Sequence, residues 1–181
     1  MQNLIRKISL IIYYGIASKL PNYSYPGGVF YNWFRIKCLK NIIVIGANCR
    51  IMKGVYIGDG NNVQIGDNCR INENVRLDNV KIGSHVMIAR DCVCLGKMHQ
   101  FEDIHMPMEK QEVKVTQQTI IEDDVWIGLR VILMPGINVK KGTIIGAAAV
   151  VTKDTDEYGI YAGVPAEFIR YRKNNAIGLT M

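Results

Sequence analysis

The side chains best suited to acid–base chemistry are three histidines, His85, His99 and His105. With an unperturbed pKa of about 6.5, a histidine is largely neutral at pH 7 and can take a proton from a hydroxyl group as its oxygen attacks. A positioned base typically accelerates a reaction by about 10² to 10⁴. Glu102 and Asp103 follow His99 closely and could orient its ring or bind a substrate hydroxyl; the alternative is that both are solvated loop charges.

Cysteines are the other candidates for reactive side chains. The five cysteines are an odd number, have no CxxC spacing and lie inside apolar periodic runs. We therefore expect buried free thiols and a reducing, cytoplasmic environment. They are Cys38, Cys49, Cys69, Cys92 and Cys94.

A six-residue period organises the segments that carry these side chains. It fits neither a 3.6-residue helix nor one strand that continues through several repeats, because strands usually end after about 5 to 6 residues. It does fit a triangular solenoid, in which each six-residue repeat, or hexad, makes one short strand and one corner, and three hexads close a coil. Downstream, the aliphatic of each hexad is Val115, Ile121, Ile127, Leu133, Val139, Ile145 and Val151.

The same phase continues upstream, with irregular steps after Ile57, Leu77 and Cys94. Seventeen inward positions in all predict between five and six coils. A glycine often follows the inward aliphatic, where we expect it to relieve the turn. The upstream positions are Leu39, Ile45, Ile51, Ile57, Ile65, Ile71, Leu77, Ile82, Ile88 and Cys94.

The longest irregular step places one histidine at an edge of the solenoid. Cys94 and Val115 are 21 residues apart, 15 more than one repeat requires, which predicts an excursion loop at 96–114. His99 stands where the chain leaves the solenoid, and loops of this length in a compact repeat usually have a function. We expect His85 to be a solvated corner and His105 to serve loop packing.

The flanking segments predict caps for the two ends of the solenoid. We expect an N-terminal helical cap and linker over 1–38, the β-helix over 39–157, and a closing segment and tail over 158–181. Residues 1–20 carry an aliphatic stripe at helical spacing, which predicts a helix that covers the first coil; the alternative is a basic helix on a membrane surface. Residues 166–175 predict a short C-terminal helix.

The composition of the 181 residues is that of a folded globular chain, with 49% hydrophobic and 21% charged residues. The net charge of +6 favours anionic partners. No basic stretch is interleaved with aromatics, so we expect no nucleic-acid partner. The longest apolar run near the N-terminus, Ile8 to Ile12, is too short to span a bilayer, and no cleavage site follows it convincingly. We expect no transmembrane helix and no export signal.

Between Leu39 and Arg172 the sequence contains VWIG followed by PG, IIGA, VVTKD and the closing GVPA. With this set of motifs the chain resembles the hexapeptide-repeat acyltransferases, and among them the acetyltransferases that act on sugars and bacterial surface polysaccharides. It implies an all-β, left-handed parallel β-helix, a homotrimer, and acetyl-CoA in the groove between neighbouring chains. The implied function is acetyl-CoA-dependent O-acetylation of a sugar or surface-polysaccharide precursor, without a metal.

The resemblance also assigns roles to residues. His99 matches the general base, and the backbone amide of Leu129 matches the donor to the oxyanion. Asn72 and Asp78 match polar positions for sugar hydroxyls. Residues matching the acetyl-CoA site are Trp126, Gly128, Gly146 and Ala147 along the pantetheine arm, and Lys153 and Arg170 at the phosphates.

The sequence departs from the family pattern at three positions. Leu129 is bulkier than the residues common at its position, Ala148 stands where glycine is frequent, and Glu167 stands where a basic residue is often found. Trp126 has an equally good interpretation as packing between subunits.

Three other functions stay open. N-acetylation of an amino sugar would use the same base and co-substrate. A metal hydrolyase would need three histidines as zinc ligands, as in carbonic anhydrases built on the same prism. A non-catalytic scaffold would fail to bind CoA.

Overall fold

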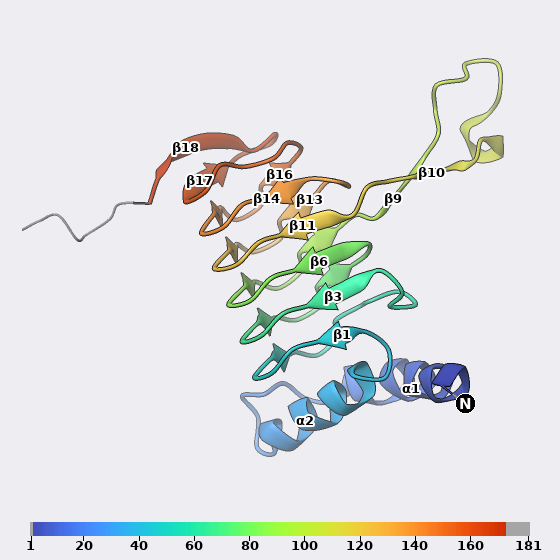
Figure 1. Ribbon diagram of the computed structural model, residues 1–181, viewed down its shortest axis with the longest axis vertical. Coiled ribbons are helices and arrows are strands. Elements are labelled where there is room, and N and C mark those ends of the chain that lie inside the picture. Colours follow the sequence, from blue (N-terminus) through green and yellow to red (C-terminus); the bar gives the residue numbers. More distant parts are fainter. Residues whose placement is uncertain (1, 173–181) are drawn as a thin grey trace, which may run out of the picture.

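The structure, a computed structural model, describes residues 2–172, which form a β-solenoid with helices at one end (Figure 1). Three parallel sheets make its faces, here called A, B and C in the order in which the chain visits them. Face A holds β1 (Val44–Ile45), β3 (Val63–Ile65), β6 (Val80–Ile82), β11 (Thr119–Ile121) and β14 (Asn138–Val139). Face B holds β2 (Arg50–Ile51), β4 (Arg70–Ile71), β7 (Met87–Ile88), β12 (Trp126–Ile127), β15 (Ile144–Ile145) and β17 (Gly159–Ala162). Face C holds β5 (Arg76–Leu77), β8 (Val93–Cys94), β13 (Ile132–Leu133) and β16 (Val150–Val151).

The predicted solenoid is confirmed, and its coils stack in register. Ile51 pairs with Ile71, Ile71 with Ile88 and Ile88 with Ile127, so each inward aliphatic rests on its counterpart one coil away. Five coils are followed by β17, which begins a sixth. The core is therefore a column of side chains rather than a sphere.

Small or β-branched side chains fill the second inward row, which includes Cys49, Cys69 and Cys92, whereas Cys94 lies on the first inward row and Cys38 on α2. All five are buried and free, as predicted. The Sγ of Cys92 donates to the carbonyl of Gly128 at 2.9 Å. Burial raises the pKa of the Cys94 thiol to about 12, which keeps it protonated and unreactive at neutral pH.

The corners follow a rule different from the one expected. The left-handed backbone occurs three residues after the inward aliphatic, as at Asn68 (φ 58°) and Gly136 (φ 77°), and not at the glycine directly after it, Gly58 excepted. That glycine is required by stacking instead: a Cβ on Gly66 would lie 2.7 Å from the carbonyl carbon of Gly83 in the next coil. Non-glycine residues with this left-handed backbone in regular corners are Asn48, Asn68, Asn74, His85, Asp91, Asp124, Arg130 and Ala148.

The cap consists of α1 (Gln2–Gly15), the 3-10 turn η1 (Ala17–Lys19) and α2 (Gly28–Leu39). The helix predicted near the N-terminus is present, whereas α2 was not predicted. Leu39, expected to begin the inward row, is the last residue of α2 and is buried under the first coil. Among residues 2–172, no helix has the length and apolarity needed to cross a bilayer.

α1 covers the first coil with the face opposite to the predicted one. Tyr13 donates its hydroxyl hydrogen to the carbonyl of Val55 at 2.8 Å, and Tyr14 to that of Gly58 at 2.7 Å. Most of the aliphatic stripe points to solvent, with Leu4 62% and Ile11 74% exposed, whereas Ile12 packs against the core. The hydrogen-bonding residues face the coil because its carbonyls at this end have no next coil to pair with.

The predicted C-terminal helix is wrong over residues 167–171. They form β18 (Glu167–Tyr171), which pairs antiparallel with β17 and covers the last edge of face B. Phe168 meets the buried Tyr161 edge-on, with ring centroids 5.6 Å apart. An edge strand that would otherwise be unpaired is thereby closed. The remainder of the predicted helix, 173–175, lies outside the described residues.

The excursion is an antiparallel arm of β9 (Lys97–His99) and β10 (Val113–Val115), with the 3-10 turn η2 (Met108–Lys110) near its tip. It projects from the corner between faces C and A, away from β17 and β18 (Figure 1). Val115, expected on the inward row, pairs in the arm with Lys97. The hexad phase resumes with β11.

Candidate functional site

His99 lies on the arm and not on the solenoid wall. It is exposed at the end of β9, opposite Val113 of β10. Of the histidine rings in the described part of the chain, the one with a side-chain partner is His85, whose Nε2 lies 3.5 Å from Nδ2 of Asn68. The His99 ring is therefore presented to whatever approaches the arm from outside the chain.

Of the two acidic residues near His99, Asp103 takes part in hydrogen bonds within the arm, while Glu102 is exposed. Asp103 accepts the backbone N–H of His105 through Oδ1 at 2.8 Å. The Nε2 of Gln111 donates to the carbonyls of Asp103 and Met106, at 2.8 and 2.9 Å. Asp103 thus shapes the tip of the arm through the backbone of His105, whose side chain is exposed.

A pocket opens at the base of the arm, at the C/A corner. Asp78, Lys97 and Lys114 line it, beside Asn79, whose Nδ2 donates to the carbonyl of Thr116 at 3.2 Å. Asp78, a predicted acceptor-binding residue, packs against Gly96, which precedes His99 by three residues in the chain. The two lysines were not among the predicted site residues; basic residues flanking an excursion were the signal that could have identified them.

Leu129 lies on another corner, between faces B and C. Its carbonyl accepts the N–H of Ala148 from the next coil at 2.7 Å, while its own N–H has no acceptor within residues 2–172. At the matching positions of two A/B corners, the N–H groups of Ala47 and Ser84 donate to Asp67 and Asp123 of the next coil, both at 2.6 Å. Leu129 therefore offers an unused backbone donor at the surface.

The small residues near Leu129 are required by coil stacking. A Cβ on Gly128 would lie 2.7 Å from the Ala147 nitrogen, and one on Gly146 would lie 3.0 Å from the Cβ of Ala162. Asn72, two coils earlier on the same corner, donates its Nδ2 to the carbonyl of Ile88 at 2.9 Å. Stacking alone thus explains why these residues are small or polar, and it leaves the exposed Ala147 open to a ligand.

Trp126 and Arg170 lie in one row of face B. Trp126 pairs with Ile144, Ile144 with Ile160 and Ile160 with Arg170, all with outward side chains. Half of the Trp126 surface is exposed. Lys153 is exposed after β16, on the C/A corner that carries the arm.

The predicted site residues thus form two groups on neighbouring corners. His99, Asp78 and Lys153 belong to the C/A corner, whereas Leu129 and Asn72 belong to the B/C corner. Face C separates them, and one hexad of extended chain spans at most roughly 20 Å. A base must lie within about 3 Å of the proton it removes, and a donor equally close to the developing oxyanion. Within one chain, His99 and Leu129 thus lie at opposite edges of face C.

The geometry does not assemble the three histidines of the metal-enzyme alternative. His85 lies on the A/B corner, while His99 and His105 lie on the arm. Within residues 2–172 there is no cluster of three or more histidine, cysteine, aspartate or glutamate side chains able to hold a metal ion.

Two family models match the chain. "Bacterial transferase hexapeptide (six repeats)" matches residues 42–78, and "Hexapeptide repeat of succinyl-transferase" matches residues 118–153. Among curated proteins, a galactoside O-acetyltransferase of Escherichia coli (strain K12) is 31% identical over 152 residues, which cover 82% of this chain and 72% of the relative.

Solved structures share the fold at lower identity. A hexapeptide-repeat acetyltransferase of Vibrio cholerae O1 biovar eltor, in complex with acetyl coenzyme A, has a TM-score of 0.77 at 24% identity, covering 95% of this chain and 89% of that one. A maltose O-acetyltransferase of Clostridium difficile 630 has a TM-score of 0.71 at 22% identity, covering 96% and 89%. These similarities show that the cap and the solenoid together form a known arrangement.

Proposed function

The chain belongs to the hexapeptide-repeat acetyltransferase family, and from this premise we propose that it transfers the acetyl group of acetyl-CoA to a hydroxyl of a sugar or surface-polysaccharide precursor, with His99 as general base. The activity class, acetyltransferase, follows from family membership. The O-acetyl specificity is supported by the galactoside O-acetyltransferase that matches most of the chain.

The observation that best supports this site is that His99 and Leu129 lie at about the same height along the solenoid axis. The arm leaves after β8 and returns into β11, and Leu129 follows β12 of that same coil. Rotation about an axis parallel to the solenoid keeps every residue at its height. A cyclic trimer of this kind would bring His99 of one chain to the level of the Leu129 N–H of its neighbour. We therefore propose a homotrimer with its active sites between chains.

The proposed chemistry uses these two groups in sequence. His99 accepts the proton of the acceptor hydroxyl as its oxygen attacks the thioester carbonyl. The Leu129 N–H donates to the negatively charged oxygen of the tetrahedral intermediate. His99 then returns the proton to the departing CoA thiolate. The acceptor becomes an acetyl ester and the base ends neutral, as it began.

Acetyl-CoA would lie along the B/C corner and the adjoining face of a neighbour. Ala147 and the stacked glycines Gly128 and Gly146 leave a narrow surface against which an extended pantetheine arm can lie, and Trp126 stands on the adjoining face. Lys153 and Arg170 are exposed cations suited to the phosphates. Asn72 and Asp78 are proposed to bind acceptor hydroxyls, Asp78 from the pocket at the arm base.

The first test removes the proposed base. His99→Ala is expected to lower kcat by about 10² to 10⁴, with CoA affinity retained in calorimetry. His85→Ala is the matched control, because His85 is an exposed corner residue on a different edge. Full activity of His99→Ala would remove His99 from its role. Absence of CoA binding in the unmodified protein would favour a scaffold instead.

The second test removes the proposed oxyanion donor. Leu129→Pro deletes the N–H, and Pro135 shows that this corner position, two residues after the inward aliphatic, accepts proline. We expect kcat to fall by about 10² to 10³, while Leu129→Ala, which keeps the N–H, retains activity. Equal activity of the two variants would contradict the assignment. Assays on hydroxyl and amino sugars side by side would separate O- from N-acetylation.

A further inference from the structure

The outward stripe of α1 has no partner within the described chain. Leu4, Ile8 and Ile11 lie one helical turn apart along its solvent side and are each about half exposed or more. The opposite side meets the solenoid through Tyr13 and the buried Ser9. α1 is therefore apolar on both sides: Leu10, Ile12 and Tyr14 pack against the core, while Leu4, Ile8 and Ile11 face solvent.

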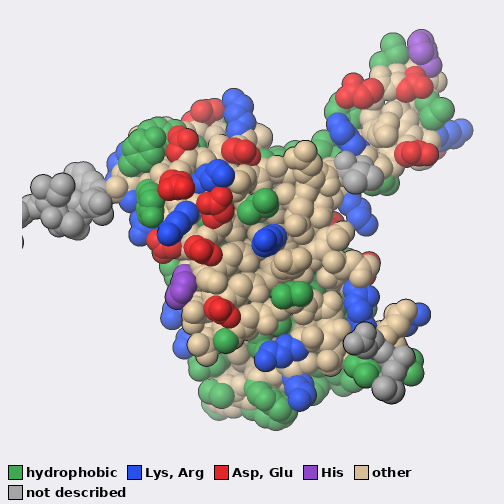
Figure 2. Space-filling model, in the orientation of Figure 1, with side chains coloured by type: hydrophobic (Ala, Val, Ile, Leu, Met, Phe, Trp, Pro, Cys, Tyr) green, Lys and Arg blue, Asp and Glu red, His purple; other side chains and the backbone are tan. Residues whose placement is uncertain are grey.

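The helix α2 adds aromatic side chains to the same end of the molecule. Val29, Phe30 and Trp33 are each more than half exposed, and Phe30 stacks on Trp33 with ring centroids 5.8 Å apart. Both helices lie across the end of the column below β1 (Figure 1), and Figure 2 shows hydrophobic side chains gathered there. We call Leu4, Ile8, Ile11, Val29, Phe30 and Trp33 the cap surface.

The charge of the cap complements an anionic partner. The first 58 residues contain eight lysines and arginines and no aspartate or glutamate, whereas the remaining residues carry 14 basic and 16 acidic residues. The excess of basic over acidic residues is thus concentrated in this first part of the chain, although Arg35 is buried and Arg6 contacts the carbonyl of Asp59 and the side chain of Asn61. Lys7 and Lys37 are exposed on the two helices beside it.

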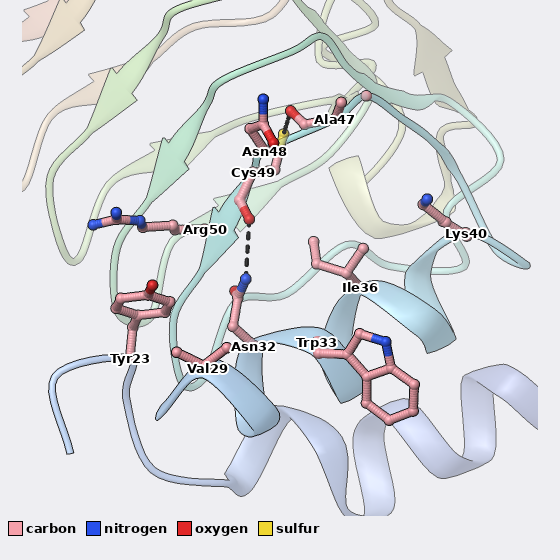
Figure 3. A pocket seen from close by; sticks show the side chains of 11 residues that line it. Tyr23, Val29, Asn32, Trp33, Ile36, Lys40, Ala47, Asn48, Cys49 and Arg50 are labelled. Atoms are coloured by element: carbon pink, nitrogen blue, oxygen red, sulfur yellow. Dashed lines mark hydrogen bonds between the residues drawn. The ribbon is translucent and has the colours of Figure 1, made fainter. Parts of the chain in front are cut away.

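A groove between α2 and the first coil opens beside these side chains (Figure 3). Trp33 and Lys40 line it from the helix, and Arg50 lines it from β2, with its guanidinium 4.4 Å from the Tyr23 ring centroid. Its lining contains no acidic residue. Lys40 lies on the side of the groove where Trp33 stands, and Arg50 lies on the other side over Tyr23 (Figure 3), so each cation is placed beside an aromatic ring where it could meet a phosphate at the boundary between an apolar layer and water.

We propose that the cap docks the protein onto the surface of an anionic lipid bilayer. Exposed aliphatic and aromatic side chains on helices, flanked by lysine and arginine, are the features that hold interfacial helices at the headgroup level. Each basic residue near an anionic surface adds about 1 kcal/mol. The two effects reinforce each other at one end of the column, while the arm and the acetylation site lie further along it.

The proposed trimer would strengthen this docking. A trimer about an axis parallel to the solenoid carries its three caps at the same end, so that they meet one flat surface together. The second and third contacts are then intramolecular, which raises avidity without new residues. This step rests on the proposed trimer, whereas docking of a single cap does not.

The experiment is co-sedimentation of the full chain with vesicles, without acetyl donor or acceptor. We expect the protein to pellet with vesicles of phosphatidylcholine and phosphatidylglycerol in equal parts and to stay in the supernatant with phosphatidylcholine alone. High salt should release much of it, because exposed charges are screened. Equal binding to both vesicles, or to neither, would overturn the proposal. Since no acetyl transfer is read, this failure is distinguishable from failure of the proposed function.

Variants separate the apolar from the charged contribution. Ile11→Gln with Trp33→Gln should lower partitioning at least about tenfold, whereas Ile104→Gln, at an even more exposed position on the arm, should not. Lys7→Glu with Lys37→Glu should also lower it, and Lys81→Glu with Lys110→Glu should not. Unchanged partitioning of the cap variants would contradict docking through the cap. If light scattering instead showed cap-to-cap pairs that Ile11→Gln with Trp33→Gln dissociates, the cap surface would be assigned to a second copy of the chain.

Discussion

Within each hexad, three positions have distinct structural roles. The inward aliphatic fills the column, the residue after it must permit the next coil to approach, and the third residue after it takes the left-handed backbone. Asparagine, aspartate and glycine adopt that backbone most readily. His85, Arg130 and Ala148 occupy it as well, so stacking of the neighbouring coils outweighs the local preference there.

The stacking position can be tested away from the site. Gly66→Ala places a Cβ 2.7 Å from the Gly83 carbonyl, so we expect a loss of about 1 to 3 kcal/mol in the free energy of unfolding. Gly15→Ala, where a Cβ would meet nothing within 4 Å, should be neutral or slightly stabilising. Urea unfolding of the two variants measures the difference. Equal stability would show that the coils can separate to admit a methyl group.

Among the elements, the cap is held by one buried arginine. Arg35 of α2 donates from Nε to the carbonyl of Ala17 at 3.0 Å, from Nη1 to that of Ile51 at 3.3 Å, and from Nη2 to those of Leu20 and Pro21. Burial lowers the pKa of its guanidinium, but arginine stays charged in proteins. Four carbonyls from the cap and the first coil thus replace a carboxylate partner.

Removing this arginine should loosen the cap. Arg35→Met keeps much of the volume but leaves those carbonyls without a donor, so we expect a loss of at least about 3 kcal/mol. Limited proteolysis should then cut between η1 and α2. Lys37→Met, exposed on the same helix, is the control and should behave like the unmodified protein. Resistance of Arg35→Met to both treatments would show that the arginine is dispensable.

The arm is separable from the solenoid at the level of elements. The last hydrogen bond between its two strands runs from the N–H of Gln100 to the carbonyl of Glu112, at 3.0 Å. Replacing residues 101–111 by Asn-Gly, a sequence suited to a two-residue hairpin turn, should leave thermal unfolding unchanged. We expect a higher KM for the acceptor if the tip borders its pocket. An unchanged KM in steady-state assays would exclude the tip from acceptor binding.

For the molecule as a whole, the separation of His99 and Leu129 by face C predicts complementation between chains. Mixed trimers refolded from His99→Ala and Leu129→Pro chains in equal amounts should regain about one quarter of the activity by random assortment, because each site takes one group from each chain. Either variant alone should stay inactive. Light scattering should give three times the 20.4 kDa of one chain. No recovery of activity in verified mixed trimers would place both groups within one chain.

The arrangement of the repeats could be predicted from sequence because it depends on local spacing. A hexad specifies its own strand, corner and inward residue, and identical coils stack in only one register, so Ile121, Ile127 and Leu133 had to be buried. The missing features at the ends do not repeat. α2 and β18 cover the backbone groups that each end of the column leaves unpaired. Their own sequences are not part of the six-residue repeat, so the repeat could not predict them.

The sequence by itself determined the solenoid, its number of coils and the place where the arm leaves it, since all three are written in the spacing of branched aliphatics. Only the tertiary structure decided that the aliphatic stripe of α1 faces solvent, because carbonyls of the first coil compete for the polar side of the helix. It alone also decided that His99 and Leu129 lie on different corners. The corner on which a residue lies depends on how the whole chain winds around the solenoid. The spacing of neighbouring residues does not determine which groups end up on the same corner.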